Sequence, residues 1–119
     1  MKIDVKNPPR TFTVNGAGIR DDIHDCGTIA LAPNEQVTLV TEAGGEYDVT
    51  RKAWGFYATP SMNGRLKNYS FKTALVENEA GRLYIMIVEA DRMDLFEKYC
   101  RDDHQTVLRW FDEHPERSK

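Results

Sequence analysis

The sequence predicts one α+β domain that is mostly antiparallel β. A meander of about six strands forms a small β-barrel or a two-layer β-sandwich, and two short C-terminal helices follow it. Turn signals recur at Pro33-Asn34, Gly44-Gly45, Asn63-Gly64 and residues 78–81, between segments rich in β-branched and aromatic residues. After Ala90 the apolar spacing changes to that of a helix. A chain of 119 residues is long enough to bury one core, so residues 1–119 are interpreted as a single domain.

The turn signals divide the first part of the chain into six predicted strands. These strands span residues 11–14, 23–31, 36–42, 46–58, 65–77 and 82–89. Pro8-Pro9 precedes the first of them and shortens it, because proline cannot donate to a strand ladder. Residues 83–88 are apolar at every position, which is typical of a strand buried on both faces. We expect that strand to lie at the centre of the core.

Two helices are predicted within residues 91–113. Asp91 can cap the first helix, with Asp94 three residues on, and Asp102 with Gln105 resembles a second capping box. The apolar side chains at helical spacing are Met93, Phe96 and Cys100 in the first helix and Val107, Trp110 and Phe111 in the second. Pro115 ends the second helix, and residues 115–119 form a frayed tail.

Composition excludes several classes of protein. The net charge of −3 argues against nucleic-acid binding, which depends on neutralising phosphates with cations. The longest apolar run, residues 83–88, is too short to cross a bilayer, and the first six residues lack the apolar stretch of a signal peptide. We therefore expect a cytoplasmic protein that binds no membrane. In that reducing compartment Cys26 and Cys100 are expected to be free thiols, and two thiolates cannot complete a four-cysteine metal site.

The charges are distributed unevenly along the chain. Residues 49–76 contain no Asp or Glu but five cations, whereas the remaining residues carry 11 positive and 19 negative side chains, a balance of −8. We call residues 49–76 the basic stretch. A block of cations beside aromatic residues in an acidic chain indicates a surface for an anionic ligand.

A hairpin register assigns the basic stretch to two faces. If Asn63-Gly64 is a two-residue hairpin loop, Phe56 lies opposite Phe71, and Trp54 and Tyr69 share their aromatic face, which should be largely buried. The opposite face combines cations with hydroxyl groups and small residues. Its predicted ligand-binding residues are Arg51, Tyr57, Ser70 and Lys72, with Arg65 and Lys67 near the turn. This face predicts a small binding domain for an anionic small molecule, such as a nucleotide or sugar phosphate, without a cofactor.

Other interpretations of the same residues stay open. The cations can instead solubilise an exposed sheet face. His24 can act as a base with Tyr57 or Tyr69 as the acid, which would make the chain an isomerase or epimerase that needs no metal. Asp22, His24 and Cys26 share one face of a strand, but this spacing is not specific enough to predict a metal site. The chain can also be a non-catalytic interaction subunit that docks on a larger enzyme, or a homodimer, through an exposed strand or aromatic patch.

Overall fold

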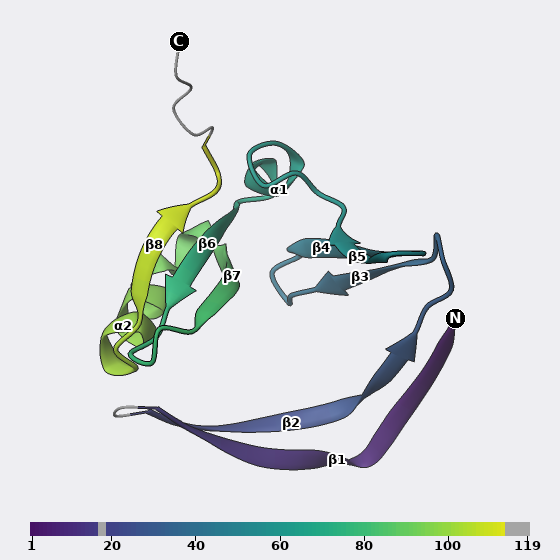
Figure 1. Ribbon diagram of the computed structural model, residues 1–119, viewed down its shortest axis with the longest axis horizontal. Helices are drawn as coiled ribbons and strands as arrows, with labels where there is room; N and C mark the ends of the chain where they lie inside the picture. Colours follow the sequence, from purple (N-terminus) through teal and green to yellow (C-terminus); the bar gives the residue numbers. More distant parts are fainter. Residues whose placement is uncertain (17–18, 114–119) are drawn as a thin grey trace.

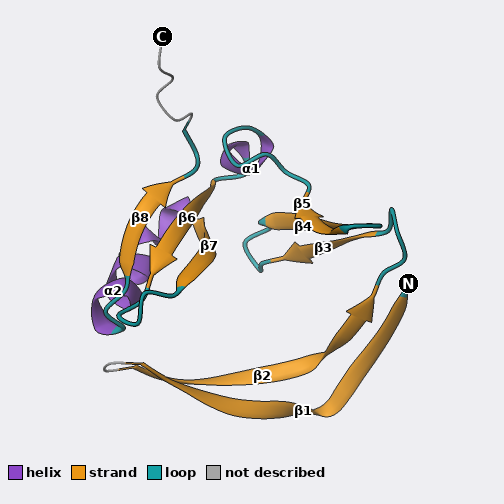
Figure 2. Cartoon of the chain, viewed as in Figure 1, coloured by secondary structure: helices purple, strands orange, loops and turns teal. Residues whose placement is uncertain are grey.

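The protein is mostly antiparallel β, with three small sheets and one C-terminal α-helix (Figures 1 and 2). The computed structural model describes residues 1–16 and 19–113. The strands are β1 (Lys2–Gly16), β2 (Ile19–Ala30), β3 (Gln36–Val40), β4 (Glu46–Lys52), β5 (Gly55–Ala58), β6 (Phe71–Glu77), β7 (Leu83–Glu89) and β8 (Thr106–Trp110). The helices are α1 (Arg65–Asn68), the 3-10 turn η1 (Ala90–Arg92) and α2 (Met93–Asp102). The described residues form no closed barrel, so the barrel prediction is not confirmed.

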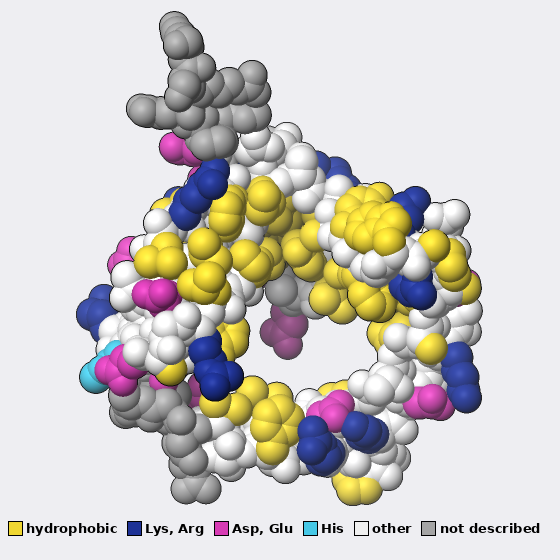
Figure 3. Space-filling view, in the orientation of Figure 1, with side chains coloured by type: hydrophobic (Ala, Val, Ile, Leu, Met, Phe, Trp, Pro, Cys, Tyr) yellow, Lys and Arg dark blue, Asp and Glu magenta, His cyan; other side chains and the backbone are white. Residues whose placement is uncertain are grey.

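Strands β1 and β2 form a long two-stranded ribbon, which we call the arm. It curves past the other two sheets, and the space-filling view shows an opening between the arm and the rest of the molecule (Figures 1 and 3). The predicted first strand, 11–14, is thus the end of a much longer one. Pro8 and Pro9 fall in the irregularity between Val5 and Arg10, where the strand pairing shifts register, so their missing N–H groups interrupt no regular ladder.

The predicted strand 46–58 is two strands. Lys52 pairs with Gly55, so β4 and β5 form a hairpin whose loop is Ala53-Trp54, and Arg51 lies opposite Phe56. The predicted pairing of Phe56 with Phe71 is therefore wrong. Gly55 has a φ of +149°, a conformation that L residues with side chains rarely adopt, and this backbone allows the chain to reverse here rather than at Asn63-Gly64.

The Asn63-Gly64 segment leads into a helical turn instead of a hairpin. The side-chain oxygen of Ser61 accepts a hydrogen bond from the Arg65 N–H at 3.1 Å, and the Leu66 N–H donates to the Ser61 carbonyl at 3.0 Å. These two bonds supply partners for N–H groups that a helix start leaves unpaired. The beginning of the predicted strand 65–77 is consequently α1, and the strand β6 starts only at Phe71.

Strand β6 is the centre of the C-terminal sheet, whose strand order is β7-β6-β8. The prediction that residues 83–88 form the central buried strand is wrong, because β7 is an edge strand and Leu83 and Ile85 are exposed. The apolar side chains that are buried come mostly from β6 and the elements against it. They are Leu66, Phe71, Ala74, Val76, Val88 and Cys100.

The first predicted helix is confirmed as η1 and α2, whereas the second is wrong because residues 106–110 form strand β8. The register explains the error. Val107 pairs with Val76 and Trp110 pairs with Ala74, with a register shift between these pairs. This irregularity brings Val107 and Trp110, three residues apart, to the same face of the sheet, which imitates helical spacing. None of the helices in the described part of the chain is long and apolar enough to cross a membrane.

The whole chain is more open than a compact domain of its length. Its Cα radius of gyration is 16.3 Å, whereas a compact domain of this length has about 13.5 Å. The β3–β4 turn connects the two three-stranded sheets, because Thr41 donates a 2.6 Å hydrogen bond to Glu89 on β7. Because the chain is extended and buries few side chains, much of its apolar surface is exposed to solvent.

Candidate functional site

The structure does not bring the predicted anion-binding residues onto one sheet face. Arg51 and Tyr57 lie in the β3-β4-β5 sheet, whereas Lys72 lies in the β7-β6-β8 sheet. Ser70 precedes β6 in a left-handed conformation, with a φ of +65°. Arg65 and Lys67 lie on α1.

Acidic residues from outside the basic stretch neutralise two of its cations. Arg65 Nη1 lies 2.8 Å from the Oδ2 atom of Asp48, and Lys72 Nζ lies 3.9 Å from Asp112 Oδ2. The Lys72 ammonium also lies 4.6 Å from the centre of the Trp110 ring, within the range of a cation–π contact. Arg65 and Lys72 thus have partners within the chain that a free anion would have to displace. For Arg65 and Lys72, the absence of acidic residues within residues 49–76 therefore does not leave an unpaired cation in the folded chain.

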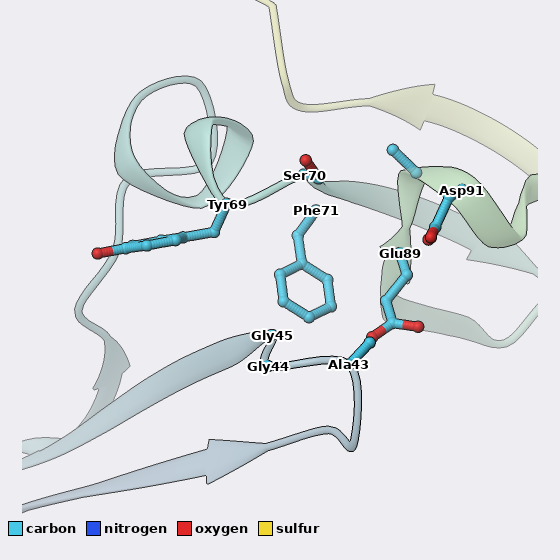
Figure 4. Close-up of a pocket in the computed structure, with 9 residues that line it drawn as sticks. Ala43, Gly44, Gly45, Tyr69, Ser70, Phe71, Glu89 and Asp91 are labelled. Carbon is cyan, nitrogen blue, oxygen red and sulfur yellow. The ribbon is translucent and has the colours of Figure 1, made fainter.

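Tyr69 and Ser70 line a pocket of about 530 Å³ between the two three-stranded sheets (Figure 4). The β3–β4 turn forms one side, where the ring of Phe71 approaches Gly45 so closely that a Cβ atom on Gly45 would lie 2.5 Å from it. The charged residues that line this pocket are Glu89 and Asp91. Two carboxylates repel anions, so this pocket does not suit the predicted phosphate-bearing ligand.

The predicted catalytic residues lie on separate elements. His24 is on β2, Tyr57 is on β5, and Tyr69 follows α1. His24 Nδ1 is 2.9 Å from the Thr11 hydroxyl oxygen, and Asp22 accepts a 2.7 Å hydrogen bond from Thr13. These pairs occupy the polar face of the arm. In the described residues, no three His, Cys, Asp or Glu side chains gather in a way that could hold a metal ion.

The most exposed aromatic surface is the β4–β5 hairpin. Trp54 is 73% exposed and Phe56 is 63% exposed, and Tyr57 lies against Trp54 with a ring-centre distance of 6.2 Å. The register predicted from the sequence buries Trp54 and Phe56 opposite the next strand, and it is wrong because Phe56 pairs with Arg51. We call residues 51–57 the aromatic hairpin. The signal that could have identified it is the glycine in the run Trp-Gly-Phe-Tyr, which begins two residues after Lys52, because glycine inside a strand pattern marks a break.

Two cations adjoin these aromatic rings. The Arg51 guanidinium carbon lies 5.8 Å from the centre of the Phe56 ring, and Lys52 donates a 2.9 Å hydrogen bond to the Asn34 side chain. The Nη1 atom of Arg51 is buried and has no hydrogen-bond partner among the described residues. A buried donor without a partner is costly, so this guanidinium can donate a hydrogen bond to an additional acceptor. The hairpin therefore combines exposed aromatic area with positive charge.

Comparisons of this chain with protein-family models, curated proteins and solved structures give no match. The acidic pocket and the aromatic hairpin are the two candidate functional sites of the described chain. The hairpin is the better candidate site because Trp54 and Phe56 expose large apolar area for which folding alone offers no explanation.

Proposed function

We propose that this chain is a non-catalytic interaction subunit that docks on a larger protein through the aromatic hairpin. The observation that carries the proposal is the exposure of Trp54 and Phe56, at 73% and 63%. Burying apolar surface yields about 25 cal/mol per Å², and a large aromatic side chain offers 150–250 Å². A partner that covers both rings would thus gain several kcal/mol from them before the costs of association are subtracted.

The residue types of the hairpin also suit an interface. Trp, Tyr and Arg are the residues most enriched at the energetic centres of protein interfaces, and residues 51–57 contain one of each. Arg51 lies opposite Phe56 and Lys52 lies opposite Gly55 in this hairpin. A complementary partner presents an apolar pocket with Asp or Glu at its rim, since opposite charges steer association and fix the orientation of the complex.

A second candidate function is binding of an anionic small molecule at Arg51. The buried Nη1 atom without a hydrogen-bond partner favours it, because a phosphate or carboxylate oxygen would satisfy that donor. This candidate differs from the first in its dependence on the aromatic rings. Inorganic phosphate binding would be lost in Arg51→Ala and kept in Trp54→Ser, whereas docking of a protein would be weakened by both substitutions.

Site-specific photo-crosslinking tests the docking proposal in cells that naturally make the protein. A photoreactive residue replaces Trp54 in one version and Ala80 in the control, since Ala80 is exposed in the turn between β6 and β7. We expect a discrete adduct with another protein from position 54 and none from position 80. The same adduct should disappear when Arg51→Glu is added, because the substitution reverses the charge beside Phe56.

Two outcomes would overturn the docking proposal. One is that position 54 yields no adduct, which would leave the aromatic rings without a partner. The other is that positions 54 and 80 yield the same adducts, or that Arg51→Glu leaves the adduct unchanged, because random collision would then explain the crosslinks.

A further inference from the structure

The arm gathers most of its large apolar side chains on one face. Residues that pair across antiparallel strands lie on the same face, and Ile3 pairs with Ile29 while Phe12 pairs with Ile23. The polar face carries hydrogen-bonded pairs such as Thr11 with His24. The opposite face, which we call the apolar face, carries Ile3, Val5, Phe12, Val14, Ile23 and Ile29. The same register places the Arg10–Asp25 ion pair and Asp21 on this face as well.

The apolar face of the arm has no cover within the described chain. Its six apolar side chains range from 39% exposed for Phe12 to 74% exposed for Val5. Within residues 1–16 and 19–113, neither β1 nor β2 pairs with any other strand. A two-stranded ribbon alone is marginally stable at best in water, so an arm of this length needs a surface to pack on. Figure 3 shows an opening between the middle of the arm and the body of the same chain.

We infer that a second copy of this chain covers the apolar face of the arm. The same molecule leaves a matching surface uncovered, because Leu83 and Ile85 on the edge strand β7 are 56% and 58% exposed. In a two-fold dimer each copy contributes one arm and one receiving face, so a single contact type is formed twice. This inference concerns a different surface from the aromatic hairpin and goes beyond the proposed docking function.

Charge also favours an identical partner. Residues 1–30 contain four Lys or Arg and four Asp or Glu residues, so the arm is neutral although the chain as a whole carries −3. On the arm itself, Lys6 and Arg10 both form ion pairs with Asp25. A neutral arm with internally paired charges avoids like-charge repulsion when it meets another copy of an acidic protein.

Light scattering coupled to size-exclusion chromatography measures the mass of the purified protein and tests the inference. The measured mass of the wild type should be twice the chain mass of 13.7 kDa. Ile23→Lys places a charge on the apolar face and should reduce the mass to that of one chain. His24→Lys, the neighbouring residue on the polar face, is the matched control and should remain a dimer. Ile85→Lys tests the receiving face and should also give one chain mass.

A wild type of one chain mass at high micromolar concentration would overturn the inference, and so would a dimer that survives both Ile23→Lys and Ile85→Lys. Survival in Ile85→Lys alone would overturn the assignment of β7 as the receiving face. Hydrogen exchange on the wild type tests the inference without any variant, so it remains informative if Ile23→Lys misfolds. Amides of β1 and β2 should be protected in concentrated protein and lose protection on dilution, whereas protection in a monomer would mean that one chain covers its own arm.

Discussion

Arg65 at the start of α1 forms an ion pair with Asp48 in the middle of β4, with 2.8 Å between Nη1 and Oδ2. Asp48 is buried, and its other carboxylate oxygen accepts a 2.5 Å hydrogen bond from Thr38. These contacts join α1 and two neighbouring strands, so they fix the base of the sheet that carries the aromatic hairpin. The hydrogen bond from Thr38, together with the nearby Arg65 charge, lowers the pKa of Asp48 below its usual range.

Asp48 should make the stability of the fold depend on acid pH. Because its pKa is lower in the folded protein than in the unfolded chain, the stabilisation is complete above about pH 4 and is lost as the pH falls through the folded pKa. Asp48→Asn should cost about 1–3 kcal/mol at pH 7, and the difference from the wild type should shrink toward pH 2. Urea denaturation at several pH values measures both quantities.

The control for this prediction is Asp102→Asn. Asp102 forms an exposed ion pair with Lys98 on α2, and exposed pairs contribute about 0–1 kcal/mol. Equal losses of stability in the two variants at pH 7 would contradict the structural role that we assign to the buried pair.

Aromatic residues of the hairpin should matter little for folding. Trp54→Ser and Phe56→Ser should each change the free energy of unfolding by less than about 0.5 kcal/mol, because both side chains are exposed. Leu66→Ala, which empties a fully buried position on α1, should cost about 2–5 kcal/mol. Urea denaturation compares the three. If Trp54→Ser destabilised the protein as much as Leu66→Ala, the ring would be a part of the core and not a docking residue.

The two cysteines should react at very different rates. Both are free thiols, but Cys26 is exposed and Cys100 is buried. Burial is the main cause that raises the pKa of the Cys100 thiol, and the nearby negative charges of Asp103 and Glu97 raise it further. Since the thiolate is the reactive form, a thiol reagent at pH 8 should modify one cysteine rapidly and the second only after unfolding. The denatured protein without reductant should titrate as two thiols. Rapid labelling of both cysteines in the native protein would contradict the burial of Cys100.

The antiparallel strands and the first C-terminal helix could be predicted because local signals dominate there. Turn residues separate strands rich in β-branched side chains, and Met93, Phe96 and Cys100 follow the spacing of α2. Strand β8 could not be distinguished from a helix, because the register shift opposite Leu75 and Val76 places Val107 and Trp110 on one face.

The candidate site could be predicted only in its residue types. The sequence indicated that cations and aromatic rings gather within residues 49–76, but two turns competed to define the register, and the chain reverses at Ala53-Trp54. Because the chain reverses there, Lys72 lies in another sheet and Trp54 and Phe56 are exposed. The site also depends on long-range partners: Asp112, which neutralises Lys72, is 40 residues further along the chain and cannot be paired with it by local pattern.

Selection of random displayed peptides on the purified protein tests the docking account most directly, because it requires no knowledge of the natural partner. We predict enrichment of peptides that place Asp or Glu beside a large apolar residue, with binding that weakens as salt screens the charges of Arg51 and Lys52. The enriched peptides should bind Trp54→Ser at least tenfold more weakly than the wild type, a loss of about 1.4 kcal/mol. No enrichment, or peptides that bind Trp54→Ser as tightly as the wild type, would contradict a docking role for the aromatic hairpin.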